Sequence, residues 1–212
     1  MNQPGEDHYL ALWHLVTYLS NTASAGIHYW HPKSIQSLPE APIPNILSET
    51  YELQEMSGTE SQHLVAFVDS DWATNMKKHT SMTGMVLMMS GGAIDYKSKF
   101  QMVIAHSSTE AEFVAICNMG KMILFFRAFL EDIGVEQEYA MVLFEDNNGA
   151  LLMANSQQPT KRTRHIYIKH FAILDWVEQD LLILHTISTH DNTADAMTKP
   201  LTKTLFHHHY DT

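Results

Sequence analysis

Residues 64–71 read Leu-Val-Ala-Phe-Val-Asp-Ser-Asp, a short apolar run that stops at acidic residues. The β-branched and aromatic side chains of this run predict a β-strand. Asp69 and Asp71 are two residues apart, so they face the same side of a strand, and periodicity alone does not choose between them. A strand that ends in carboxylates is the first indication of a functional site.

The residues that follow predict further strands and a long helix. Residues 83–89, a glycine turn, and residues 94–96 followed by 102–105 favour an antiparallel three-stranded meander together with the first run. Ser107-Ser108-Thr109-Glu110 is typical of a helix start. Apolar positions then recur every three or four residues until Gly134, which predicts a helix of that length.

A second apolar run, residues 140–144, also ends in acidic residues, Glu145 and Asp146. A short asparagine-capped helix is expected at 149–154. The remaining expectations are a helix at 165–178, a strand at 181–187 and a helix at 191–199 that Pro200 ends. The order β-β-β-α-β-α-α-β-α predicts an α/β fold, with helices on the faces of a mixed sheet.

Composition limits the alternatives. The chain has 212 residues, 45% of them hydrophobic, which suits one domain of about 130–150 residues with flanking sequence. Apolar runs fall short of the roughly 20 residues that a membrane span needs, so no membrane partner is expected. No secretory signal is recognisable, so we expect an intracellular protein. Cys117 is the only cysteine, which excludes an internal disulfide and a multi-cysteine zinc site.

The flanking segments differ from this block. Residues 6–19 have apolar side chains at helical spacing, whereas residues 31–62 are rich in proline and glutamate and predict a linker. The domain itself is expected at 63–201. Residues 202–212 form a tail, for which a disordered polar end is favoured over a transition-metal site at His207-His208-His209.

The formal charge of −11 argues against binding to nucleic acid, because affinity for phosphates normally comes from Lys and Arg. The charges are unevenly distributed, however, and local sign matters more than net sign. One segment concentrates basic side chains. The candidates for phosphate contacts are Lys161, Arg162, Arg164 and Lys169.

Four carboxylates lie at element ends, where a two-metal site would draw its ligands. Asp69 and Asp146 end strands, Glu110 lies in the first turn of the long helix, and Asp195 lies in the first turn of the last helix. Each has a structural alternative. Glu110 stands at a capping-box spacing from Ser107, Asp146 could cap a helix, and Asp195 could favour a helix dipole.

Six ordered motifs resemble the ribonuclease H region of copia-type retrotransposons over nearly all of residues 64–201. They are Phe67-Val68-Asp69-Ser70-Asp71-Trp72-Ala73, Ser81-Met82-Thr83-Gly84 with Gly91-Gly92-Ala93-Ile94, Ser107-Ser108-Thr109-Glu110-Ala111-Glu112-Phe113, Glu145-Asp146-Asn147-Asn148-Gly149-Ala150, Thr163-Arg164-His165-Ile166, and Ala194-Asp195-Ala196-Met197-Thr198-Lys199-Pro200-Leu201. Residues 1–30 more weakly resemble the end of a reverse transcriptase region.

The resemblance implies a ribonuclease H-like fold with a mixed five-stranded sheet and helices on both faces. It implies that Asp69, Glu110, Asp146 and Asp195 hold two Mg²⁺ ions, for which Mn²⁺ can substitute, and that the chain hydrolyses the RNA strand of RNA–DNA hybrids. The implied partner is the reverse transcriptase portion of the polyprotein, in a cytoplasmic virus-like particle or the nucleus. His190, five residues before Asp195, is a candidate proton shuttle.

Some positions depart from the family. Tyr96 stands where the family usually has Trp, Phe100 where it has a basic residue, and His106 where it has an aliphatic one. Two alternatives therefore stay open: a catalytically inert ribonuclease H-like interaction module, or a metal site with another substrate, since integrases and junction resolvases use the same carboxylate geometry.

Overall fold

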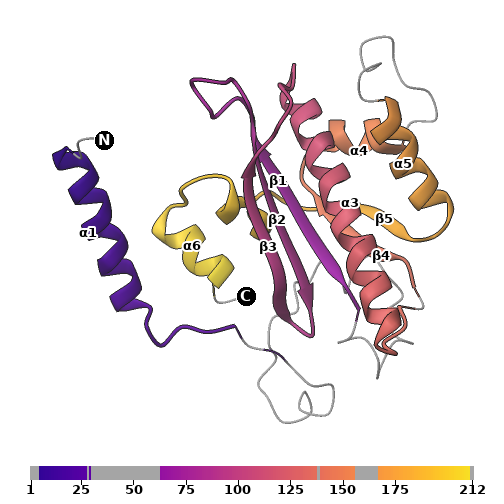
Figure 1. Ribbon diagram of the computed structural model, residues 1–212, viewed down its shortest axis with the longest axis horizontal. Coiled ribbons are helices and arrows are strands. Elements are labelled where there is room, and N and C mark those ends of the chain that lie inside the picture. Colours follow the sequence, from indigo (N-terminus) through magenta and orange to yellow (C-terminus); the bar gives the residue numbers. More distant parts are fainter. Residues whose placement is uncertain (1–4, 28, 30–62, 138, 156–166, 211–212) are drawn as a thin grey trace.

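The computed structural model describes residues 5–27, 29, 63–137, 139–155 and 167–210. Figure 1 shows one twisted sheet with helices on both faces. Its five strands run in the order β3-β2-β1-β4-β5. Their bounds are β1 Val65–Asp71, β2 Met82–Met89, β3 Gly92–Phe100, β4 Met141–Glu145 and β5 Leu182–Thr186. The first three pair antiparallel, and β4 and β5 run parallel to β1, so the predicted mixed sheet is confirmed.

Strand β1 lies at the centre of the sheet because its side chains are apolar on both faces. Ala66, Phe67 and Val68 are all buried, with Val68 fully inaccessible. A near-continuous hydrophobic run of this kind requires cover on both sides of the sheet. Strand β3 is an edge strand, and its second half is exposed and carries Lys97 and Lys99. Charged side chains on an edge strand oppose pairing with another chain.

One face is covered by three helices: α3 Ser108–Asp132, α4 Asn148–Asn155 and α5 Tyr167–Glu178. Ser107 caps α3 by accepting a hydrogen bond from the Glu110 backbone NH. The inner side of α3 carries the buried side chains Phe113, Ile116 and Met119. This helix is long and apolar enough to cross a membrane by length and composition alone. Half of its most apolar window is buried within the domain, as expected of a core helix.

The opposite face is covered by the C-terminal part of the chain. A 3-10 helix, η5 Thr193–Met197, packs on β1 and β2, and helix α6 Lys203–Tyr210 follows it. Phe67 and Phe144 stack with their ring centroids 5.2 Å apart and belong to a second, smaller core on this side. In Figure 1, α6 (yellow) and α3 lie on opposite sides of the sheet.

Three local predictions are wrong. Strand β3 is continuous to Phe100, and residues 102–105 are an irregular bend rather than a strand. The helix predicted at 191–199 is only the short η5, whose Asn192 cap accepts a hydrogen bond from the Ala194 backbone NH. Residues 203–210, predicted within a disordered tail, form α6, whose Phe206 contacts Tyr18 and whose His208 contacts Asp191. The linker predicted at 31–62 lies outside the described residues.

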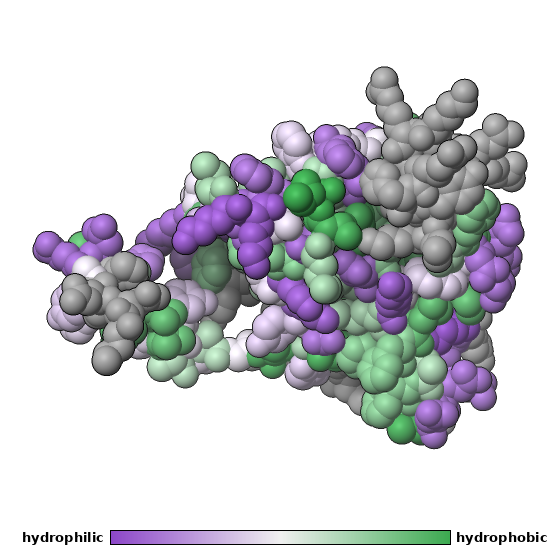
Figure 2. Space-filling model, turned by 45° about the horizontal axis from the view of Figure 1, so that its top comes forward, coloured by the Kyte–Doolittle hydropathy of each residue, from purple (hydrophilic) through white to green (hydrophobic). Residues whose placement is uncertain are grey.

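The predicted N-terminal helix is confirmed as α1 Glu6–Asn21. It stands apart from the sheet in Figure 1, and the ring of Tyr18 meets that of Phe206 in α6 edge to face at 5.9 Å between centroids. Large apolar side chains on this helix are exposed, and Figure 2 shows hydrophobic side chains on the left-hand projection that α1 forms. They include Tyr9, Leu10, Leu12, Trp13, Leu15, Val16 and Leu19.

Candidate active site

The two acidic strand ends meet at one edge of the sheet. β1 and β4 are parallel neighbours, with Phe67 opposite Phe144, so the residues after them emerge side by side. Asp69 near the end of β1 is 3% exposed, and Asp146 directly follows β4. The carboxyl ends of parallel strands are the usual location of binding sites in open α/β sheets. Of the two candidates on β1, only Asp69 joins the cluster of carboxylates described next.

Glu112, on α3, is the third carboxylate at this edge. One oxygen each from Asp69, Glu112 and Asp146 lie within 4.8 Å of one another. Glu110, the residue predicted from the sequence, lies outside this group. Glu110 Oε2 instead accepts a hydrogen bond of 2.9 Å from the His106 backbone NH, and Ser107 Oγ accepts one from the Glu110 backbone NH. Glu110 therefore accepts from the residue before the N-cap Ser107, whereas a capping box would use the Ser107 backbone NH.

Asp195 lies on η5, 1% exposed, beside but outside this group of three. Its Oδ1 forms an ion pair of 2.8 Å with Lys199 Nζ. Thr198, near the same turn, donates a hydrogen bond from Oγ1 to Asp69 Oδ2. The structure thus places Asp69, Asp146 and Asp195 at one edge of the sheet, with Glu112 rather than Glu110 beside Asp69 and Asp146. Which of these carboxylates bind metal stays a prediction.

Two residues hold η5 against the strands. Asn192 is fully buried, and its Nδ2 donates to the Val68 carbonyl at 2.9 Å. Gly84 lies opposite Asp69 in the β1–β2 pairing, and a Cβ added there would lie 2.6 Å from the Ala194 carbonyl oxygen. Only glycine permits this approach of η5 to β2. Sequence reasoning identified Gly84 only as part of a motif and missed Asn192.

Burial and mutual repulsion perturb the carboxylates. Burial is the main cause that raises the pKa of Asp69 from 3.8 to about 6, and the charges of Asp195 and Asp146 add to it. Burial also raises the pKa of Glu112, and the neighbouring Glu145 raises it further. In the part of the chain that the structure describes, Glu112 Oε2 and Glu145 Oε2 are buried without a hydrogen-bond partner. Such acceptors fit a site for a cation with oxygen ligands.

Glu145 is a further buried acid that sequence reasoning did not single out. It ends β4, is fully inaccessible, and its Oε1 accepts a 3.0 Å hydrogen bond from the Asn147 backbone NH. Burial raises its pKa. Its position directly before Asp146 at a strand end is a signal that could have identified it.

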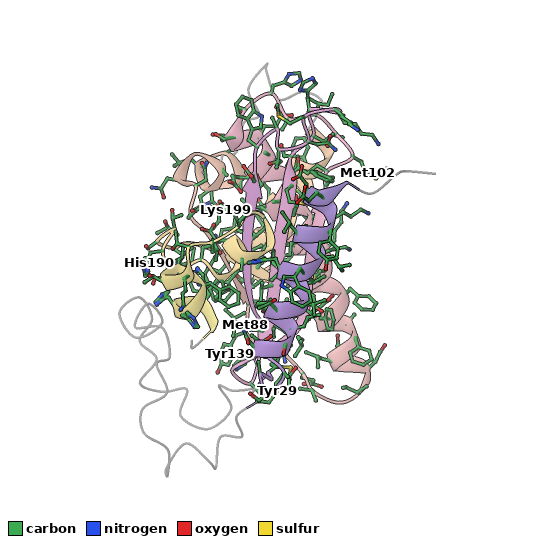
Figure 3. The ribbon with its side chains drawn as sticks, turned by 90° about the vertical axis from the view of Figure 1, so that its left-hand side faces the viewer. Tyr29, Met88, Met102, Tyr139, His190 and Lys199 are labelled. Carbon is green, nitrogen blue, oxygen red and sulfur yellow. The ribbon has the colours of Figure 1, made fainter. Side chains whose placement is uncertain are left out.

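Lys199 places a positive charge beside the carboxylates at this edge of the sheet. Burial alone would lower the pKa of its ammonium, but the hydrogen bond to Asp195 and the charge of Asp69 outweigh burial and raise it. Lys199 is therefore positively charged at neutral pH and offsets part of the negative charge. Figure 3 labels it at the side of the domain that the yellow C-terminal segment covers.

The remaining predicted residues are four basic side chains and His190. Lys161, Arg162 and Arg164 lie outside the described residues, and Lys169 lies on α5, where its side chain is not described. His190 is exposed on the loop between β5 and η5, and its Nδ1 lies 3.4 Å from Asp191 Oδ1. Its role as a proton shuttle stays a prediction.

Comparisons with known proteins show what the chain is similar to. No protein-family model matches the chain. The chain is 34% identical over 144 residues, 68% of its length, to a retrovirus-related Pol polyprotein from transposon TNT 1-94 of Nicotiana tabacum. It is 27% identical over 97% of its length to that from transposon RE2 of Arabidopsis thaliana. The chain spans only 11% and 12% of these relatives.

The fold is also that of a solved structure. LC11-RNase H1, isolated from compost by a metagenomic approach, superposes with a TM-score of 0.50 and 16% sequence identity. The likeness covers 65% of this chain and 93% of the other. At this identity the superposition establishes the fold.

Proposed function

Because this chain belongs to the Pol polyproteins of copia-type retrotransposons and has the ribonuclease H fold, we propose that it hydrolyses the RNA strand of RNA–DNA hybrids. The observation that carries the proposal is the convergence of Asp69, Glu112 and Asp146 from three different elements. Carboxylates gathered in this way are costly to a folded protein unless a cation binds them. Their presence at the carboxyl ends of β1 and β4 therefore favours a metal-dependent hydrolase.

The donor set fits divalent cations of the Mg²⁺ class, which prefer carboxylate oxygens. Asp69, Glu112 and Asp146 would hold one ion, and Asp195, beside Asp69, would contribute to a second. When bound, two Mg²⁺ or Mn²⁺ ions supply Lewis acidity to the attacking water and to the leaving 3′-oxygen of a phosphodiester.

The protein's own residues prepare this site. The Thr198 hydroxyl orients the Asp69 carboxylate through their hydrogen bond, and Asn192 and Gly84 set the position of η5. Lys199 forms an ion pair with Asp195 and offsets part of the negative charge of the metal-free site. Preorganised ligands of this kind lower the cost of binding a metal and a phosphodiester together.

Recognition of the substrate is assigned to basic side chains. Contacts to phosphates and 2′-hydroxyls distinguish an RNA–DNA hybrid without reading bases. Lys161, Arg162, Arg164 and Lys169 remain the candidates, and they immediately precede or open α5. Their concentration in one segment supports a local phosphate-binding surface on a chain whose net charge is −11.

The exposed apolar side chains of helix α1 favour contact with another part of the polyprotein. Its exposed Leu10, Trp13 and Leu19 side chains leave apolar surface that a soluble domain rarely presents on a whole helix. Because residues 1–30 resemble the end of a reverse transcriptase region, that region is the expected partner, in a virus-like particle or the nucleus. Trp13→Asp should weaken association with a separately purified polymerase region and leave the fold of residues 63–210 intact.

The decisive experiment is cleavage of a strand-labelled RNA–DNA hybrid by the purified chain in Mg²⁺ or Mn²⁺. The wild type should cut only the RNA strand, and Asp69→Asn and Asp146→Asn should not cut. Circular dichroism should show that all three proteins are folded. A folded wild type that binds the hybrid without cutting it would contradict the proposal.

That outcome would favour the alternative, an inert ribonuclease H-like interaction module. One observation favours this inert module: Tyr96 and Phe100 on β3 are 65% and 42% exposed. At these positions the family usually has Trp and a basic residue, respectively. Exposed aromatic side chains on an edge strand suit contact with another protein.

A further inference from the structure

A second group of metal-binding side chains lies outside the candidate active site. His190 and Asp191 belong to the loop between β5 and η5, and His208 belongs to α6. One ligand atom of each lies within 4.8 Å of the others. The rings of His190 and His208 are 4.4 Å apart between centroids. In Figure 3, His190 lies at the outer margin of the molecule, beside yellow helix α6.

The spacing of these atoms matches a tetrahedral site. His208 Nε2 lies 3.1 Å and His190 Nδ1 lies 3.4 Å from the same oxygen, Asp191 Oδ1. Zinc binds imidazole nitrogen and carboxylate oxygen at about 2.0–2.1 Å, so ligand atoms on a tetrahedron lie about 3.3 Å apart. The two distances to Asp191 Oδ1 are close to this spacing, and all three ligand atoms lie within 4.8 Å of one another.

We propose that His190, Asp191 and His208 form a zinc site that fastens α6 to the loop before η5. Two imidazoles and one carboxylate favour Zn²⁺ over Mg²⁺, which binds almost entirely through oxygen. The fourth position would be open to water. Binding needs the ring tautomers that place a lone pair on His190 Nδ1 and His208 Nε2, and both rings can adopt them.

The site differs from the carboxylate cluster in position and in ligand chemistry. Asp191 contacts both imidazoles through the same oxygen, Oδ1. A zinc ion here would also hold His190 away from any proton transfer, a consequence that rests on the proposed function.

Isothermal titration of the full chain with Zn²⁺ at pH 7.5 tests the site. The wild type should bind one ion here, and excess Mg²⁺ should not displace it. His208→Ala and His190→Ala should each weaken binding roughly tenfold or more. The matched control is His207→Ala, which removes an exposed histidine from the same helix, outside the cluster, and should bind like the wild type.

A second variant separates this site from the candidate active site. Asp69→Asn/Asp146→Asn should still bind Zn²⁺ with wild-type affinity, even if the hybrid is never cut. Equal losses in His207→Ala and His208→Ala would overturn the proposal in favour of a nonspecific histidine segment. Loss of zinc binding in the double variant alone would place the ion on the carboxylates and also overturn it. Circular dichroism of every variant excludes unfolding as the cause.

Discussion

Glu110 and Glu112 are two residues apart near the start of α3, yet only Glu112 lies with Asp69 and Asp146. Each residue of an α-helix turns the side chain by about 100°, so these two carboxylates point in nearly opposite directions. Glu110 points back to the helix start, where it accepts a hydrogen bond from the His106 backbone NH. The two glutamates therefore have separate roles, and they can be tested separately.

Glu112→Gln should reduce hybrid cleavage about a thousandfold, because it removes a charged metal ligand worth several kcal/mol to the transition state. Glu110→Gln is the matched control. It should retain activity and lose about 0.5–1 kcal/mol of unfolding free energy, since it weakens a helix cap and a favourable charge at the helix start. Cleavage rates and urea unfolding measure both effects. If Glu110→Gln is folded but inactive while Glu112→Gln remains active, Glu110 rather than Glu112 would be the metal ligand.

Asp69→Asn should stabilise the metal-free protein at neutral pH. The pKa of Asp69 is about 6 in the folded state and 3.8 without the protein's influence, so the folded state binds the proton more tightly. Stability therefore falls as pH rises through roughly 4 to 6, and the full cost, on the order of 3 kcal/mol, is present above that window. The variant lacks this cost.

Urea unfolding with EDTA at pH 7.5 and pH 4 measures the difference between the two proteins. The variant should be more stable at pH 7.5, and its advantage should shrink at pH 4. Added Mg²⁺ should stabilise the wild type more than the variant. Equal stability of both proteins at pH 7.5 would show that burial of the Asp69 carboxylate does not destabilise the folded protein.

Lys199→Met should strengthen Mg²⁺ binding several-fold and lower the melting temperature of the metal-free protein. Both effects follow because the Lys199 ammonium pairs with Asp195 and compensates the other carboxylates. Titration calorimetry with Mg²⁺ and thermal unfolding in EDTA measure them. Lys203→Met, on the exposed start of α6, is the control and should change neither. Weaker Mg²⁺ binding in Lys199→Met would contradict this role.

Gly84→Ala should lower stability by about 1–3 kcal/mol and reduce cleavage, because the new Cβ would overlap the Ala194 carbonyl and move η5 away from Asp69. Gly26→Ala is the matched control, since a Cβ there meets nothing within 4 Å. Urea unfolding and the hybrid assay distinguish the two variants. Wild-type stability of Gly84→Ala would mean that η5 tolerates a larger separation from β2.

Much of the fold was predictable because its signals are local. The apolar run before Asp69 predicts β1, and the Ser107 cap with the Gly134 stop predicts α3 within two residues at each end. Residues 102–105 were mispredicted as a strand because an apolar run favours a strand wherever it occurs. Their backbone hydrogen bonds depend on a neighbouring strand, which the sheet does not provide there.

Local signals in the chain were enough to predict the order of the elements, the acidic ends of β1 and β4, and the family, because each depends on residues close together in the sequence. The grouping of Glu112 rather than Glu110, and of Asp69 rather than Asp71, with Asp146 became visible only in the folded domain, as did the helical state of residues 203–210. These outcomes depend on which side of an element faces β1 or η5. The Asp191–His208 contact joins residues 17 apart, and the Asp69–Thr198 hydrogen bond joins residues 129 apart. Such contacts form only when the sheet brings distant segments together.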